Sequence, residues 1–92
     1  MDATPGQVVY SKAGRDSGRI FVITKLLDEN YVYIADGDLR RFESPKRKKI
    51  KHLKLTQDIV QSLLIKFEQE QRVSNAELRK ALAEYVQQVE NQ

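Results

Sequence analysis

Two hydrophobic periods divide the chain. In the first half, short runs of β-branched and aromatic residues alternate with Gly, Asp, Asn and Ser, which is typical of short strands joined by turns. The runs lie at 8–10, 20–26, 31–35, 40–42 and 50–53. Because no connection between them is long enough for a crossover helix, we expect an antiparallel sheet curled into a small barrel.

Turn signals agree with this interpretation. Asp28-Glu29-Asn30 predicts a hairpin between the second and third runs, and Gly37 supplies the positive φ needed after the third run. Its neighbours Asp36 and Asp38 are expected to be turn residues, because a metal loop would need further oxygen ligands.

After Thr56 the hydrophobic period lengthens to about 3.6, which predicts a helix with Thr56 as N-cap and Asp58 in its first turn. Ser74-Asn75-Ala76-Glu77 forms a capping box that predicts a second helix. We expect the apolar stripes of both helices to pack on the barrel or on each other, rather than to form a groove for a partner. The two stripes are Ile59, Val60, Leu63, Leu64, Phe67 and Leu78, Ala81, Leu82, Tyr85, Val86, Val89.

The predicted fold is therefore mainly β with C-terminal α. A barrel at 1–56 is followed by a helical extension at 57–92 that packs on it as one structural unit.

Composition excludes several functions. With 92 residues, 40% of them hydrophobic, the chain can build one small core but no large enclosed active site. It has no Cys, and its only histidine is His52, which excludes disulfides, thiolate chemistry, Cys/His zinc sites and imidazole triads. We expect a binding module that is not an enzyme and uses no metal or cofactor.

Hydropathy gives no sign of a leader or a membrane span, because no apolar stretch approaches the required length. We expect a cytoplasmic protein that does not contact a membrane.

Charge is distributed unevenly along the chain. Positions 1–56 carry twelve Lys/Arg against seven Asp/Glu, whereas 57–92 carry four against six. Within 40–54, Glu43 is the only acid among eight cations, so a polyanion is a natural partner; a solvated surface face is the alternative. The eight cations are Arg40, Arg41, Lys46, Arg47, Lys48, Lys49, Lys51 and Lys54.

The loop between the first two runs combines glycine with positive charge. Gly14 and Gly18 bracket a tip flanked by Lys12, Arg15 and Arg19, an arrangement suited to the phosphate backbone of a nucleic acid. It is not a nucleotide P-loop, because no helix is expected at Gly18. The alternative is an ordinary glycine-rich turn. Asp16 is expected to shape the tip by accepting backbone N–H bonds.

These residues resemble a known family. The spacing G-x-V-V-x-x-x-x-G-x-x-x-G-x-x-x-V over 6–22 resembles a KOW motif of RNA-binding barrels. Together with 34–41, the S-P-K-R-K-K-I-K-H-L-K-L-T segment at 44–56 and 74–82, it is similar to the fourteen-e ribosomal proteins of the large subunit and to small bacterial KOW-domain proteins. Phe21, at the position of a third glycine in many KOW motifs, favours the fourteen-e branch over the transcription factors.

The resemblance implies an SH3-like barrel that binds structured ribosomal RNA through the loop and the basic segment. Both the charges and the resemblance predict contacts mainly to phosphates and shape. The predicted RNA-binding residues are Lys12, Arg15, Arg19, Arg40, Arg41, Lys46, Arg47, Lys48, Lys49, Lys51 and His52.

Two residue types leave alternatives open. His52 is expected either to make a hydrogen bond at the barrel edge or to contact RNA. Tyr10, Tyr31 and Tyr33 are candidates for stacking on bases, but at least one face of their strands must be core.

The main hypothesis is thus a ribosome-associated RNA-binding protein. The alternative is an adaptor whose acidic helices dock ribosomal proteins or factors while the barrel serves as a scaffold. Duplex DNA is less favoured as a ligand, because no recognition helix lies among the basic residues. The acidic residues of the adaptor hypothesis are Glu68, Glu70, Glu77, Glu84 and Glu90.

Overall fold

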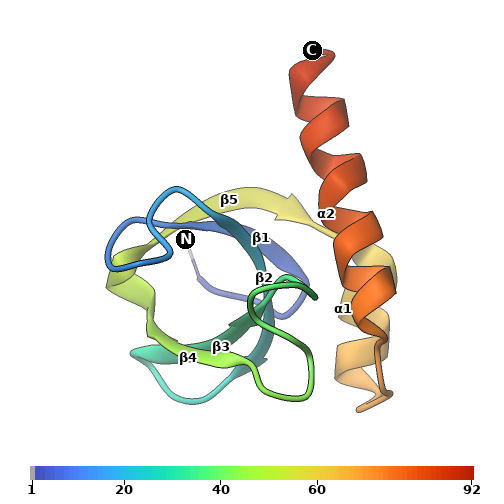
Figure 1. Cartoon of the computed structure of the whole chain (residues 1–92). Coiled ribbons are helices and arrows are strands. Elements are labelled where there is room, and N and C mark those ends of the chain that lie inside the picture. Colours follow the sequence, from blue (N-terminus) through green and yellow to red (C-terminus); the bar gives the residue numbers. More distant parts are fainter. Residues whose placement is uncertain (1) are drawn as a thin grey trace.

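A computed structural model describes residues 2–92 and consists of a five-stranded antiparallel sheet followed by two helices (Figure 1). The mainly β fold with C-terminal α is therefore confirmed. The strands are β1 Gln7–Ser11, β2 Ile20–Leu26, β3 Tyr31–Ala35, β4 Lys46–Lys49 and β5 Leu53–Ile59; one turn of 3-10 helix, η1 Ile50–His52, joins the last two, and the helices are α1 Gln61–Glu68 and α2 Asn75–Glu90.

The strands follow the order β4-β3-β2-β1-β5, so β4 and β5 are the two edges of the sheet. Figure 1 shows the sheet curling strongly, so that these edges approach each other through η1. The predicted hairpin between β2 and β3 is present: the backbone N–H groups of Asn30 and Tyr31 both donate to Asp28 Oδ1, at 2.8 and 2.9 Å.

The fourth strand was predicted at 40–42 and lies instead at 46–49. Asp36 is the physical reason, because its side chain imposes a turn on the segment that follows β3. Its Oδ1 accepts from the backbone N–H of Asp38 at 3.0 Å and of Arg40 at 2.8 Å, while Asp36 N donates to Arg40 O at 2.8 Å. The basic run itself forms the strand.

The prediction of a strand at 50–53 followed by a helix after Thr56 was also wrong. Residues 50–52 form η1, and β5 then runs to Ile59, paired with β1. Thr56 is not an N-cap: its hydroxyl donates to Val8 O at 2.7 Å, and α1 begins only after Val60. Pairing with β1 thus outweighs the local helical period.

Alternation along the strands builds two apolar clusters, one on each side of the sheet. The second cluster includes residues of α1 and α2, so the helices cover one outer face of the sheet, as Figure 1 shows. The first cluster contains Val9, Phe21, Ile23, Val32, Ile34 and Leu53, and the second Val22, Ala35, Leu63, Val73 and Leu78.

The start of α2 is tied to the loop between β3 and β4. The predicted capping box of Ser74 and Glu77 is present. Asn75 accepts from Phe42 N at 2.7 Å and donates to Glu43 Oε2 at 2.8 Å, and Arg79 donates to the Gly37 carbonyl at 2.7 Å. The loop that leads into β4 is therefore held by the helix.

Gly37 gives a test of this attachment. It has φ +79°, as predicted from the turn, and a Cβ there would lie 2.3 Å from the Asn75 carbonyl oxygen. Gly37→Ala should lower the free energy of unfolding by about 2–4 kcal/mol, from left-handed strain plus the clash. Gly18→Ala is the control, because Gly18 has φ +84° but no atom within 4 Å of the added Cβ; it should cost about 1–2 kcal/mol. Equal losses in urea unfolding would contradict the close packing of Gly37 on α2.

The Glu43 contacts predict an acid-dependent stability. The hydrogen bonds from Arg41, and then from Asn75, lower the pKa of Glu43 from 4.5 to about 2. A lowered folded-state pKa adds stability that is present above the unfolded value and is lost as the pH falls from about 4.5 to about 2. Glu43→Gln should flatten the decline in melting temperature across this window. Glu84→Gln, which removes an exposed helix carboxylate, should leave the decline unchanged.

Candidate nucleic-acid interface

The glycine-rich loop at 12–19 lies against η1 and β4, so the two predicted basic segments are neighbours. Lys12 N donates to His52 O at 2.8 Å, and the amine of Lys48 donates to Ala13 O at 2.9 Å. Two segments that are more than thirty residues apart in sequence therefore form one end of the molecule.

Asp16 holds the tip of this loop, but not in the predicted way. Its side chain is 1% exposed and its Oδ2 accepts from Arg40 Nε at 3.2 Å and Arg40 Nη2 at 3.0 Å, with the Lys46 amine 3.8 Å away. The expectation that the carboxylate would accept backbone N–H bonds was therefore wrong. A carboxylate buried this deeply is stabilised better by a planar guanidinium, which offers two donors at once.

Backbone bonds complete the loop. Gly18 N donates to Ser11 O at 2.8 Å and Arg19 N to Asp16 O at 2.9 Å, while Gly14 and Gly18 have φ of 81° and 84°. Only glycine adopts such angles without strain, so both glycines are needed for the shape of the loop.

Several predicted RNA-binding cations make internal contacts. Arg40 and Lys46 pair with Asp16, Arg19 pairs with Asp36 at 3.2 Å, and Arg41 pairs with Glu43 at 2.8 Å. Lys48 points inward from β4 and is only 8% exposed. The four that pair with carboxylates have a partner for their charge, and the Lys48 amine is held by the Ala13 carbonyl.

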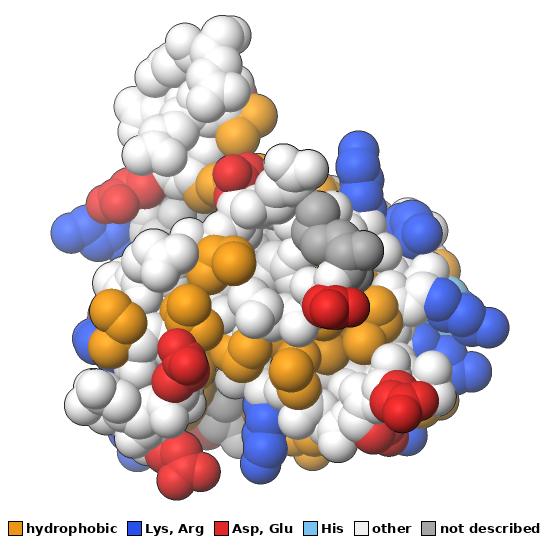
Figure 2. Space-filling view, turned by 180° about the vertical axis from the view of Figure 1, so that it is seen from behind, with side chains coloured by type: hydrophobic (Ala, Val, Ile, Leu, Met, Phe, Trp, Pro, Cys, Tyr) orange, Lys and Arg blue, Asp and Glu red, His pale blue; other side chains and the backbone are white. Residues whose placement is uncertain are grey.

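The other predicted cations stay unpaired. These cations lie on the loop, β4 and η1, and Lys54 of β5 joins them. None of them forms an ion pair with an acidic group of residues 2–92. Figure 2 shows several Lys and Arg side chains gathered on one side of the molecule. His52, which lies in η1, is half-buried. We call this set of unpaired cations the basic end; it consists of Lys12, Arg15, Arg47, Lys49, Lys51 and Lys54.

Lys54 belongs to the basic run but is absent from the predicted RNA-binding residues. It follows the buried Leu53 in β5 and pairs in register with Tyr10, so it points outward beside the loop. Strand alternation would have placed it there, had β5 been predicted at 53–59.

Tyr31 lies beside the basic end. The guanidinium carbon of Arg47 is 3.7 Å from its ring centroid, and the amine of Lys49 is 5.9 Å away. These are cation–π distances, and they fix the ring against the edge strand. Tyr10 and Tyr33 are half-buried.

The acidic helices have a different character. Glu77 pairs with Lys66, which lowers the pKa of Glu77 and links α1 to α2. The phenol of Tyr85 donates to Asp58 Oδ2 at 2.8 Å; burial, and then this bond, raises the pKa of Tyr85 to about 12. The other four predicted acids, Glu68, Glu70, Glu84 and Glu90, are exposed.

Residues 2–92 contain no cluster of three or more His, Cys, Asp or Glu side chains that could hold a metal ion. No helix among them is both long enough and apolar enough to cross a membrane.

Comparison with models of known protein families finds none that matches this sequence.

The contact between Asp16 of the loop and Arg40 can be tested by substitution of Asp16. Asp16→Asn should lower the free energy of unfolding by about 1–3 kcal/mol, because a buried charge-assisted hydrogen bond is weakened. Asp38→Asn is the control: its side chain is 77% exposed and lies 3.9 Å from Arg19, so the change should be within about 0.5 kcal/mol. Urea unfolding followed by circular dichroism measures both, and equal effects would contradict a structural role for Asp16.

Proposed function

We propose that this protein binds structured RNA, mainly through the phosphate backbone, with the basic end as the contact surface. The observation that carries the proposal is the gathering of six cations, none paired with an acidic group among residues 2–92, from two parts of the chain that are far apart in sequence. Phosphate contacts require this unpaired charge, whereas a pocket for a neutral ligand does not.

Backbone recognition suits the geometry of this surface. The cations lie on a loop, a strand edge and a turn, so they present charge over a broad curved end rather than along a helix that could enter a DNA groove. Folded RNA is commonly recognised by its shape and phosphates in this way.

We also propose a barrel type, a domain family and a ribosomal role for this protein. The curled antiparallel sheet, with a 3-10 turn between β4 and β5, supports an SH3-like barrel, and the glycine loop supports a KOW domain. The resemblance to fourteen-e ribosomal proteins makes ribosomal RNA, and hence a cytoplasmic ribosome-associated role, our preferred ligand and location. The proposed activity is binding without catalysis or a cofactor.

A second candidate is the adaptor function of the helices. The C-terminal part of α2 extends beyond the sheet in Figure 1, and it carries Glu84, Glu90 and the 44% exposed Val89. Pull-down followed by nuclease treatment separates the two functions: partners that remain after RNA is destroyed would favour the adaptor.

The RNA proposal predicts a charge effect that depends on position. Lys51→Glu/Lys54→Glu should weaken binding to a structured ribosomal RNA fragment about tenfold or more. It should also make the log–log salt slope shallower by about 1.5, since each phosphate contact contributes about 0.7 to 0.9. Fluorescence anisotropy at graded salt measures both quantities.

The matched control is Arg72→Glu/Lys80→Glu, which makes the same change in net charge at exposed sites between and on the helices. It should weaken binding much less. Equal weakening by the two double variants would show a non-specific charge effect, and binding of the wild type without a salt slope would overturn the proposal.

A further inference from the structure

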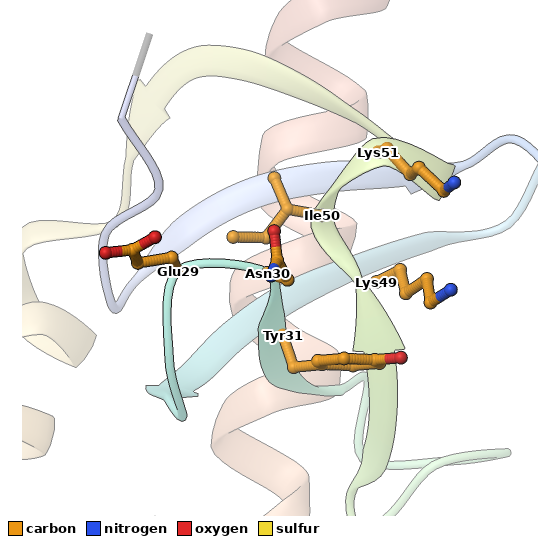
Figure 3. A pocket seen from close by; sticks show the side chains of 6 residues that line it. All are labelled: Glu29, Asn30, Tyr31, Lys49, Ile50 and Lys51. Atoms are coloured by element: carbon orange, nitrogen blue, oxygen red, sulfur yellow. The ribbon is translucent and has the colours of Figure 1, made fainter.

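A pocket of about 440 Å³ lies beside Tyr31, at the edge of the basic end (Figure 3). Its volume falls in the range of small-ligand pockets, about 300–1,000 Å³. The hairpin between β2 and β3 forms one wall, and the end of β4 with η1 forms the other. The lining residues are Glu29, Asn30, Tyr31, Lys49, Ile50 and Lys51.

The Tyr31 ring forms one boundary of this pocket. Figure 3 shows it edge-on, with Asn30, Ile50 and Lys49 on one side of the ring plane. Arg47 contacts the ring at 3.7 Å but does not line the pocket. The amine of Lys49, 5.9 Å from the ring centroid, lies on the pocket side of the ring, so a base that stacks on this face lies beside that amine.

Backbone bonds hold the two walls in place. Ile50 N donates to Asn30 O at 2.8 Å, and Tyr31 pairs in register with Lys49. Asp28 fixes the hairpin from the other side through the N–H groups of Asn30 and Tyr31. The pocket is thus formed by the folded chain itself and needs little ordering when a ligand binds.

The cationic and the acidic side chains of the pocket lie on different sides of it. Figure 3 shows the amines of Lys49 and Lys51 directed to the same side, away from the carboxylate of Glu29. One side of the pocket therefore suits a phosphate. On the other, the Asn30 amide offers a donor and an acceptor to a base edge. The aromatic face, the cations and the amide therefore match the face of a base, a phosphate and the edge of a base, respectively.

We propose that this pocket holds one unpaired nucleotide of the bound RNA, with its base stacked on Tyr31 and its phosphate against Lys49 and Lys51. The inference rests on the proposed RNA binding and adds a preference to it: RNA with an extruded base should bind more tightly than a continuous duplex. Stacking on an aromatic ring tolerates any base, so the preference is for the unpaired state rather than for a sequence.

The test compares two RNAs with the full-length chain. One is a blunt duplex, and the other is the same duplex with a single bulged adenosine. Anisotropy at one salt concentration should show tighter binding of the bulged RNA. Tyr31→Leu should weaken binding of the bulged RNA by about 5- to 100-fold and leave duplex binding almost unchanged, because it removes the stacking face and no charge.

Two variants control for folding. Tyr31→Phe keeps the aromatic face and should keep the preference. Tyr33→Leu changes a half-buried tyrosine on the same strand that does not line this pocket, and it should also keep the preference. Thermal melts of all variants show whether each is folded at the temperature of the assay.

The outcomes separate the two proposals. If the wild type binds both RNAs equally and with a salt slope, the pocket assignment is overturned while RNA binding stands. If the preference survives Tyr31→Leu, the pocket assignment is also overturned. If neither RNA binds, the proposed function itself fails. Binding of free adenosine monophosphate as tightly as the bulged RNA would overturn the assignment of the pocket to a nucleotide within an RNA chain.

Discussion

A carboxylate buried as deeply as that of Asp16 must have donors around it, and the end of the molecule is organised by this requirement. Arg40 supplies two hydrogen bonds and Lys46 adds a charge, so the loop between β1 and β2 is tied to the segment before β4 and to β4 itself. Lys48 makes a second tie through the Ala13 carbonyl. Arg40, Lys46 and Lys48 are therefore engaged inside the fold, and their contacts bring the remaining cations of the loop and of β4 side by side.

Only some cations of the basic run at 40–54 are available to a ligand. In the sequence, the run has eight positive charges and one acid over fifteen residues. In the folded chain, three of the eight are paired with carboxylates and one is buried, so the charge available to a ligand comes from the other four and from the loop. The surface therefore has fewer free cations than the sequence of the run indicates, and the paired cations hold it in place.

The sequence was sufficient to predict the elements whose signal is local. β2 and β3 have the predicted bounds, the Asp28 hairpin and the capping box at Ser74 are present, and Gly37 has a positive φ. The errors concern elements that depend on distant partners. β4 is a run of Lys and Arg with low strand propensity that forms because it pairs with β3, and β5 overrides a helical pattern because it pairs with β1. The partners of Asp16 were hidden for the same reason, since Arg40 lies 24 positions away.

The composition of β4 has a consequence for how copies of this protein meet. β4 is an edge strand made of Lys46-Arg47-Lys48-Lys49, so within residues 2–92 it pairs with β3 on one side and with no strand on the other. Two such edges brought together would place like charges opposite one another, which opposes sheet extension between molecules. The residues proposed to attract a polyanion thereby also protect the sheet from self-association. Neutralising them would remove an electrostatic barrier to aggregation along that edge.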